Sequence, residues 1–279
     1  MVQIIDGKLV SSQIKEELRE ETARLKAAGI DICLAVVQVG NDPASTVYVN
    51  NKKKACAFVG IESRAFELPE SAAEIELLNL VEQLNTDPSV NGILVQLPLP
   101  PHINEDKIIR AISPDKDVDG FHPVNVGRLW IGEQGFLSCT PAGIVQLLKR
   151  SGIEIAGKEC VIIGRSNIVG KPMAALLLRE HGTVTVAHSR TENLKEVARR
   201  ADILIVAIGK KKFIQSEYIK DGAVVIDVGM HRDENGRLCG DVDFEDVKDK
   251  VSAITPVPGG VGPMTIAMLM NNCVETVRR

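Results

Sequence analysis

The sequence lacks long apolar runs and a surplus of positive charge. Its longest uninterrupted apolar stretches, such as 203–208, are far too short to cross a bilayer. The first residues contain no basic segment followed by an apolar core, so no signal peptide is expected. Lysine and arginine together number 33 against 37 acidic residues, giving a formal net charge of −4. That balance argues against a nucleic-acid-binding protein, which usually has a basic surplus.

The sequence also lacks the spacings of disulfide-rich and metal-binding proteins. Its six cysteines lie well apart without a Cys-x-x-Cys pair, and its five histidines show no metal-ligand spacing. Reduced thiols are typical of a cytoplasm-like compartment, so we expect a cytoplasmic protein without a metal site. The 279 residues, 44% hydrophobic and 25% charged, are typical of a globular protein with one large or two modest domains.

Short apolar segments alternate with longer amphipathic ones along the chain. The segments expected as strands are mostly rich in Val and Ile, as in parallel strands covered on both faces: Cys33–Val39, Gly92–Gln96, Cys160–Ile163, Thr183–Ala187, Ile203–Ala207, Ala223–Val228 and Ala253–Thr255. The expected helices are Ser12–Ala28, Ser45–Val59, Ala72–Leu84, Pro141–Lys149, Pro172–Glu180, Glu192–Arg199 and Pro263–Val277. This alternation predicts an α/β protein with right-handed crossovers.

A break in the alternation predicts two lobes. The stiff segment 97–101 and the weakly periodic segment 113–135, rich in Asp, Gly and Pro, interrupt the pattern. We place the boundary at residue 119, with a first lobe over 1–119 and a second over 120–262. The last helix, 263–279, is expected to return to the first lobe, with the ligand between the lobes. Periodicity leaves open whether that helix packs on its own lobe instead.

A glycine turn, Gly164 to Pro172, joins an expected strand to an expected helix. Such a turn exposes backbone N–H groups to a phosphate. It is not a P-loop, because five residues separate its glycines and Pro172 follows Lys171. The dinucleotide fingerprint is matched only in part, since Ser166 stands where the second glycine normally does. The alternative is that this turn has only a structural role.

The next expected strand bears on the choice of cofactor. An NAD site would place a carboxylate near the end of this strand, but the chain continues His188-Ser189-Arg190 and reaches an acid only at Glu192. Together with Arg165, these residues suit the 2′-phosphate of NADP, because guanidinium groups bind such anions well. The alternative is that both arginines are solvated surface residues.

Tyr48 and Lys52 lie four residues apart on an expected helix and therefore share one face. A lysine near other cations, or out of water, holds its proton less tightly and can act as a base. The alternatives are a chance spacing and a solvated lysine run over 52–54. If Lys52 is functional, it belongs to a substrate lobe facing the cofactor.

Three further features of the sequence each fit two explanations. Gln96 ends an apolar strand, where it could contact a ligand or only hydrogen-bond a loop. Asp115, Asp117 and Asp119 alternate, but the spacing lacks the remaining ligands of a calcium loop. The segment 256–263 contains three glycines that permit close approach to a ligand, although a sharp turn would explain two of them.

Taken together, these segments resemble the bifunctional methylenetetrahydrofolate dehydrogenase/cyclohydrolase, or FolD, family. The matching motifs are Tyr48-Val49-Asn50-Asn51-Lys52, Gly92-Ile93-Leu94-Val95-Gln96-Leu97-Pro98-Leu99-Pro100, Asp115-Lys116-Asp117-Val118-Asp119-Gly120, Gly164-Arg165-Ser166 with Val169-Gly170-Lys171-Pro172, and Pro258-Gly259-Gly260-Val261-Gly262-Pro263-Met264-Thr265. The resemblance implies a folate-binding lobe with a returning C-terminal helix, and a Rossmann-type lobe that binds NADP. It implies oxidation of 5,10-methylenetetrahydrofolate to the methenyl form and hydrolysis of that form to 10-formyltetrahydrofolate.

The resemblance also implies residue roles and partners. The implied catalytic group comprises Lys52 as the central residue, Gln96 assisting it, Tyr48 stacked on the folate, and Asp119 holding the pterin. Further implied substrate contacts are Val95, Leu97, Pro258, Gly259, Gly260, Val261 and Gly262. The implied cofactor contacts are Thr140, Gly164, Arg165, Ser166, Ser189 and Met230. Tetrahydrofolate derivatives are the expected partners, in a homodimer that binds neither nucleic acid nor membrane.

Two other hypotheses fit part of the pattern. A shikimate-dehydrogenase-like enzyme shares the two lobes and a lysine in the first, but the Gln96 and Asp119 motifs argue against it. A non-catalytic dinucleotide sensor would share the fold, but it would have no need of Lys52, Gln96 and Asp119 together. Turnover of shikimate or of methylenetetrahydrofolate distinguishes these hypotheses.

Overall fold

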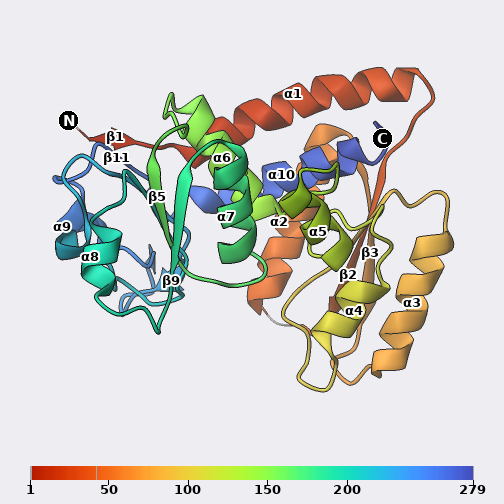
Figure 1. Ribbon diagram of the computed structural model, residues 1–279. Helices are drawn as coiled ribbons and strands as arrows, with labels where there is room; N and C mark the ends of the chain where they lie inside the picture. The colour runs from red at the N-terminus through yellow and green to blue at the C-terminus, as the bar shows by residue number, and fades with distance from the viewer. Residues whose placement is uncertain (1, 42, 279) are drawn as a thin grey trace. The chain divides into compact units, whose positions relative to one another are not determined.

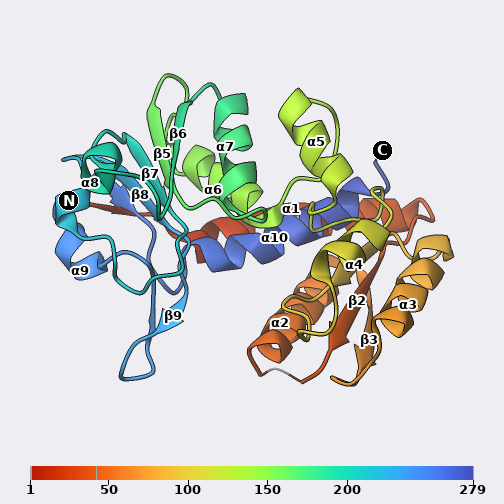
Figure 2. The ribbon, with the colours of Figure 1, turned by 60° about the horizontal axis from the view of Figure 1, so that its bottom comes forward.

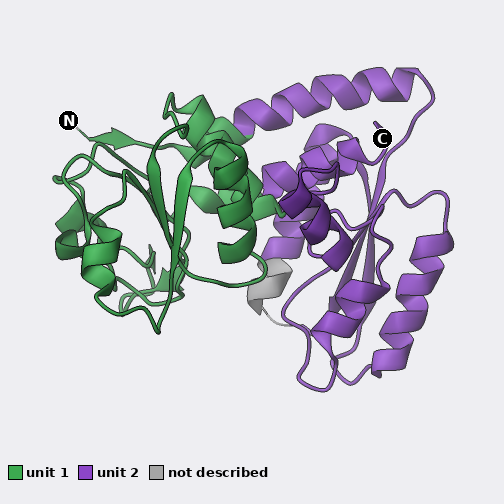
Figure 3. Ribbon diagram, in the orientation of Figure 1, with its two compact units in different colours: residues 1–11, 138–265 green, residues 12–137, 266–279 purple. Residues whose placement is uncertain are grey.

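The computed structural model describes residues 2–41 and 43–278, with side chains described except for 43–47. The chain forms two compact units, shown in Figure 3: unit 1 comprises residues 1–11 and 138–265, and unit 2 comprises 12–137 and 266–279. No helix among the described residues is long and apolar enough to span a membrane. The same residues contain no group of three or more His, Cys, Asp and Glu arranged to hold a metal ion.

Unit 1 is built on a six-stranded sheet in the order β1-β11-β8-β7-β5-β6, in which every neighbouring pair is parallel. Its strands are β1 (Gln3–Ile4), β5 (Glu159–Ile163), β6 (Thr183–Ala187), β7 (Ile203–Val206), β8 (Val224–Asp227) and β11 (Ala253–Ile254). The chain runs from β5 outward to β6 and returns to β7 on the other side of β5. The carboxyl ends of β5 and β7 therefore flank a topological switch point, where doubly wound sheets bind ligands.

Helices cover both faces of this sheet, with α7 on one side and α8 and α9 on the other (Figure 1). The helical segments that lie wholly within unit 1 are α6 (Cys139–Arg150), α7 (Gly170–Arg179), α8 (Leu194–Ala198), a 3₁₀ turn (Ser216–Tyr218) and α9 (Phe244–Val247). A small hairpin, β9 (His231–Arg232) and β10 (Leu238–Cys239), follows β8. The strands β7 and β8 are buried throughout, which is why their residues, apart from Asp227 at the end of β8, are apolar without alternation.

Unit 2 contains a parallel three-stranded sheet in the order β3-β2-β4 (Figure 2). Its strands are β2 (Cys33–Val39), β3 (Glu62–Leu68) and β4 (Gly92–Val95), and its own helices are α2 (Pro43–Val59), α3 (Glu74–Thr86), α4 (Glu105–Ala111) and α5 (Pro123–Ile131). Helices α1 (Gly7–Ala27) and α10 (Val261–Glu275) contribute residues to both units. Here β2 and β4 flank the switch point, so the carboxyl ends of these strands are where a ligand site is expected.

The α/β class with two units is confirmed, and each of the seven expected strands is present. The strand β3 was not expected, because its residues are exposed or half-buried and it lies at a sheet edge. Helix α5 lies inside the segment 113–135, which has little periodicity. The compact units place 120–137 with unit 2 and residues 1–11 with unit 1, whereas the sequence suggests a boundary at 119. The functional division at 119 stays a prediction.

Candidate active site and cofactor site

Lys52 of α2 meets Gln96 at the carboxyl end of β4. The Lys52 ammonium donates to Gln96 Oε1 at 2.9 Å, and the Gln96 amide donates to the Leu97 carbonyl at 2.6 Å. Only 9% of Lys52 is exposed, whereas Lys54 is exposed and Lys53 forms an ion pair at the surface with the exposed Glu67 at 3.8 Å. Lys52 is therefore set apart from the other two lysines of its run, which have the contacts of surface residues.

Asp119 is brought to the same place by a segment that runs beside β4. The Ile93 N–H donates to the Lys116 carbonyl at 2.8 Å, and Val118 packs so closely on Gly92 that an added Cβ would lie 2.6 Å from it. Burial raises the pKa of Asp119, and the positive charge of Lys52 partly offsets that rise. The structure thus gathers Lys52, Gln96 and Asp119 at one end of the sheet of unit 2.

Tyr48, Val95 and Leu97 lie next to this group along the chain, one helical turn before Lys52 and on either side of Gln96. Tyr48 lies one helical turn before Lys52 and is half-buried, and burial raises the pKa of its hydroxyl. Val95 is buried at the end of β4, and Leu97 is half-buried after it. An apolar wall next to a few polar groups is the usual composition of a site for a small organic ligand.

Asp117 supports the turn that carries Asp119, a role that the sequence did not reveal. It is 2% exposed and accepts hydrogen bonds from the N–H groups of Phe121 (3.2 Å) and His122 (2.8 Å) and from the Asn125 amide (2.9 Å). Burial raises the pKa of Asp117 to about 6. Its oxygens are occupied by N–H donors, which gives the alternating aspartates a structural explanation in place of calcium binding.

The raised pKa of Asp117 predicts a pH dependence of stability. The folded state holds this proton more tightly than the unfolded chain, whose carboxyl titrates near 3.8. The stabilisation from protonated Asp117 is therefore complete below 3.8 and is lost as the pH rises through about 6. From about pH 5 to pH 7, the free energy of unfolding should fall by about 1 kcal/mol more in the wild type than in Asp117→Asn. Urea unfolding at both pH values measures this difference, and Asp115→Asn, at an exposed carboxylate in the same segment, should match the wild-type slope.

Asn272 of α10 is a second residue that sequence reasoning missed. Its side-chain amide donates to the carbonyls of Val118 (2.8 Å) and Leu137 (2.9 Å), within unit 2. It therefore holds the backbone directly before Asp119. The only signal in the sequence is a pair of asparagines, 271 and 272, in a largely apolar helix.

In unit 1, the glycine turn follows β5 at the switch point. Gly164 has φ +141°, and a Cβ on it would lie 2.2 Å from the Ala207 carbonyl oxygen at the end of β7. A Cβ on Gly170, the first residue of α7, would lie 2.3 Å from the Gly164 carbonyl oxygen. Only glycine fits at both positions, and the backbone is left close to the place where a phosphate would bind.

Arg165 and Ser189 occupy neighbouring positions just after the carboxyl ends of β5 and β6. Strands β5 and β6 pair in parallel with Ile163 opposite Ala187, and the Gly164 N–H donates to the Ala187 carbonyl at 2.9 Å. Arg165 comes two residues after Ile163, and Ser189 comes two residues after Ala187. Both are exposed. The exposed Ser166 has its hydroxyl oxygen near the N–H groups of Val169 (3.2 Å) and Gly170 (3.3 Å), so it caps the start of α7.

The remaining predicted residues also lie in unit 1. Met230 follows β8 and is 46% exposed. The hydroxyls of Thr140 and Thr265 are 2.9 Å apart. The turn Pro258–Gly262 packs on the start of α1, where a Cβ on Gly7 would lie 1.8 Å from the Gly260 carbonyl oxygen. Gly7 and Gly260 therefore permit close backbone packing at this turn, whereas a Cβ on Gly262 would meet nothing within 4 Å.

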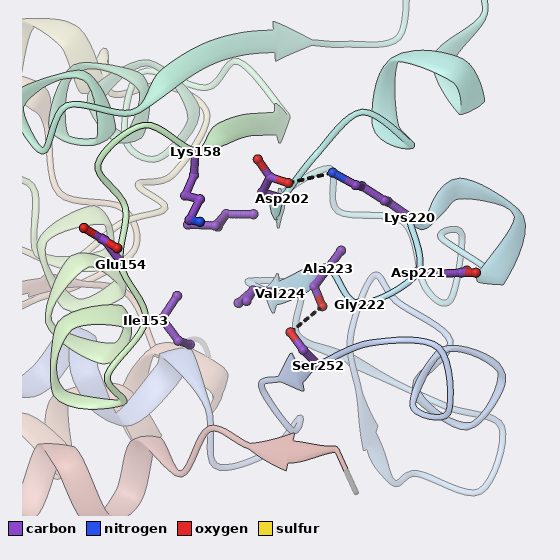
Figure 4. Close-up of a pocket in the computed structure, with 11 residues that line it drawn as sticks. Ile153, Glu154, Lys158, Asp202, Lys220, Asp221, Gly222, Ala223, Val224 and Ser252 are labelled. Atoms are coloured by element: carbon purple, nitrogen blue, oxygen red, sulfur yellow. Dashed lines mark hydrogen bonds and ion pairs between the residues drawn. The ribbon is translucent and has the colours of Figure 1, made fainter.

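A recess at the opposite end of the unit 1 sheet contains none of the predicted residues (Figure 4). It lies at the amino ends of β7 and β8, and Lys220 in its wall forms an ion pair with Asp202 at 2.7 Å. Because doubly wound sheets bind ligands at the carboxyl ends of their strands, this recess is not the cofactor site.

Unit 1 has a doubly wound sheet with a glycine turn at its switch point, and unit 2 gathers a buried lysine with a half-buried amide and carboxylate. Together these features define a dinucleotide-dependent enzyme with two α/β units. The sequence models of two tetrahydrofolate dehydrogenase/cyclohydrolase domains match this chain: the catalytic domain over residues 5–119 and the NAD(P)-binding domain over 138–279. The chain therefore belongs to the tetrahydrofolate dehydrogenase/cyclohydrolase family.

Individual relatives agree with this assignment. The chain is 71% identical over 279 residues to the bifunctional protein FolD of Lachnoclostridium phytofermentans, covering 100% of this chain and 99% of that relative. The crystal structure of FolD from Campylobacter jejuni superposes with a TM-score of 0.98 at 53% identity, covering 100% and 99% of the two chains. The Trypanosoma brucei enzyme, whose structure contains NADP and an inhibitor, has a TM-score of 0.94 at 40% identity, covering 100% and 98%.

Shikimate dehydrogenase shares only the fold. The enzyme from Thermus thermophilus has a TM-score of 0.56 at 15% identity, covering 88% of this chain and 99% of its own. The shikimate-dehydrogenase-like hypothesis explained the architecture, but the family membership overturns it as an account of the activity.

Proposed function

We propose that this protein oxidises 5,10-methylenetetrahydrofolate to 5,10-methenyltetrahydrofolate with NADP, and then hydrolyses the methenyl form to 10-formyltetrahydrofolate. The observation that carries the proposal is the contact of Lys52 with Gln96 beside Asp119, in a chain of the dehydrogenase/cyclohydrolase family. A sensor protein would have no need of this polar group in its other unit.

The residues of unit 2 suit the folate. The pterin ring offers a ring N–H and an amino group side by side, which the Asp119 carboxylate accepts in bidentate fashion. Tyr48 supplies an aromatic face for the ring, with Val95 and Leu97 as further substrate contacts in unit 2; the turn Pro258–Gly262, proposed as another substrate contact, belongs to unit 1. Lys52 serves as the base after it has released its own proton: it then takes a proton from the attacking water, and its hydrogen bond to Gln96 fixes the position of the amine.

The residues of unit 1 suit NADP. At the glycine turn, an added Cβ on Gly164 would collide with the Ala207 carbonyl oxygen. Because Gly164 has no side chain, the turn leaves the room that a pyrophosphate needs. Arg165 and Ser189 bind the 2′-phosphate, Ser166 and Thr140 contact the cofactor, and Met230 presents its backbone to the nicotinamide. When bound, NADP accepts the hydride, so this step needs the protein to orient the two reactants and no protein acid or base.

An absorbance assay tests the proposal directly. Wild-type protein with methylenetetrahydrofolate should generate NADPH, and supplied methenyltetrahydrofolate should disappear faster than it does without protein. Binding of NADP without either activity would support a dinucleotide sensor instead. Turnover of shikimate with NADP would contradict the folate assignment.

Arg165→Ala should weaken NADP and spare NAD. The substitution removes a charged partner of the 2′-phosphate, so the affinity for NADP should fall by about tenfold to a hundredfold. NAD lacks this phosphate, and its affinity should hardly change. Titration of both cofactors measures the effect, with Arg179→Ala, an exposed arginine in the last turn of α7, as the matched control. Equal losses for both cofactors would show that Arg165 does not contact the 2′-phosphate.

We also propose a cytoplasmic homodimer acting in one-carbon metabolism, which supplies purine, histidine and methionine synthesis. Strand β6 supports the dimer, because it lies at the edge of the six-stranded sheet with Val186 39% exposed. Unpaired edge strands can pair across a twofold axis. Sedimentation as a monomer at micromolar concentration would contradict this.

A further inference from the structure

Asp241 is a wholly buried carboxylate at the carboxyl edge of the unit 1 sheet. Its exposure is 0%, and Oδ2 accepts from the N–H groups of Ile208 (2.8 Å) and Gly209 (3.0 Å). Its Oδ1 accepts from the Lys210 N–H at 2.8 Å and lies 2.7 Å from His231 Nε2. A single side chain thus binds the loop after β7 and the residue that follows Met230.

A second buried carboxylate completes the arrangement. Asp227, 4% exposed, accepts from the N–H groups of Gly229, Asp241 and Val242, each at 2.9 Å. Burial raises the pKa of Asp227 to about 6. With Asp241, it fixes both sides of Met230: the Gly229 backbone before it and the His231 ring after it.

The glycines beside these carboxylates leave no room for a side chain. A Cβ on Gly240 would lie 1.9 Å from Asp227 Oδ2, and a Cβ on Gly229 would lie 2.5 Å from Asp241 Oδ1. The backbone is therefore folded tightly around the two carboxylates, and the loops they hold have little freedom to shift.

The held loops are those that border the switch point. Ile208 comes one residue after Ala207, whose carbonyl oxygen faces Gly164 of the cofactor turn. Met230 comes three residues after the end of β8. Asp241 therefore joins, through hydrogen bonds, two segments of the edge at which the proposed function places the cofactor.

We propose that Asp241, with Asp227 and His231, is a positioning group that sets where the nicotinamide end of NADP lies. This inference rests on the proposed function for the identity of the cofactor. Asp241 touches the loops rather than the cofactor, so it acts through the backbone at 208–210 and at Met230. A carboxylate suits this position because both of its oxygens accept hydrogen bonds; an amide would turn an N–H₂ group toward one of these donors.

Asp241→Asn should separate the nicotinamide end from the rest of the cofactor. The affinity for NADP and the dehydrogenase kcat/KM should each fall by about tenfold or more, since a hydrogen bond to a charged acceptor is lost. Adenosine 2′,5′-bisphosphate, which has the 2′-phosphate but no nicotinamide, should bind as it does to wild type. Hydrolysis of supplied methenyltetrahydrofolate, which uses Lys52 and Gln96, should be retained. The matched control is Asp243→Asn. The Asp243 carboxylate forms an ion pair with Lys212 at 3.7 Å and does not belong to the proposed positioning group.

His231 gives a milder test that does not remove the buried charge. His231→Phe loses the donor to Asp241 and should lower dehydrogenase kcat/KM, whereas His231→Gln keeps a nitrogen donor at a similar position and should restore it. This pair decides the question if Asp241→Asn does not fold.

Three results would overturn the inference. Fragment binding and hydrolysis could fall in parallel with dehydrogenase activity, Asp243→Asn could match Asp241→Asn, or His231→Phe could retain wild-type kinetics. A wild type without dehydrogenase activity would refute the proposed function separately. The difference between NADP and fragment affinities would still test the positioning role in that case.

Discussion

Lys52→Met should reduce cyclohydrolase activity by about a hundredfold or more, to near the spontaneous rate, because it removes the base that accepts the proton of the attacking water. Methionine keeps an unbranched apolar stem of similar length in a site that is only 9% exposed. The helix and its packing should therefore survive. The measurement is the decay of supplied methenyltetrahydrofolate with and without the variant.

The control for this prediction lies in the next residue. Lys53→Met removes an amine that forms an ion pair with Glu67 across 3.8 Å at the surface, so its hydrolysis rate should equal that of the wild type. Dehydrogenase activity of Lys52→Met distinguishes two roles: it falls less than hydrolysis if Lys52 chiefly activates water, and equally if Lys52 chiefly orients the folate. Full hydrolysis by Lys52→Met would remove the centre of the mechanism.

The parts of the fold that the sequence predicted are those with one dominant local signal. The strands β2, β5, β7 and β8 are short apolar runs because both of their faces are covered, and their bounds were predicted to within about two residues. The glycine turn at Gly164 was recognisable because a strand, a glycine and a helix follow one another. The strand β3 was not predicted because it lies at the edge of its sheet, where burial imposes little hydrophobic pattern on the sequence.

The candidate site was predictable only in part. Lys52 and Gln96 lie 44 residues apart in the chain, and their contact depends on the parallel pairing of β2 with β4. Family resemblance named both residues, but their hydrogen bond follows from the three-dimensional arrangement. Asp117 and Asp241 were missed as supporting residues, because a buried carboxylate bound by backbone N–H groups looks like any other acid in the sequence.

Asp117 and Asp119 of the motif at 115–119 have different roles. Asp117 is buried and Asp119 is half-buried. Asp117 is occupied by three N–H donors within unit 2 and shapes the turn. Asp119 lies at the end of that turn within the electrostatic reach of Lys52. One acid therefore builds the site and the next one faces it, so substitutions at the two positions should affect different measurements: stability for Asp117 and folate affinity for Asp119.

Asp119→Ala should raise the folate requirement of both activities by about a hundredfold, because the pterin loses two hydrogen bonds to one charged acceptor. NADP binding should stay intact, since the proposed cofactor residues lie in unit 1. Steady-state kinetics with varied folate, and calorimetry with NADP alone, measure the two effects. Asp115→Ala is the matched control: the same change four residues earlier, at a carboxylate whose side chain is 81% exposed.

Asp119→Asn refines this test. It keeps one oxygen acceptor but presents an amide donor to the donors of the pterin, so it should bind folate almost as poorly as the alanine variant. If the asparagine variant bound folate like the wild type, the charge of Asp119 would not be what the substrate needs. If NADP binding were lost together with folate binding, Asp119 would be maintaining the fold rather than contacting the pterin.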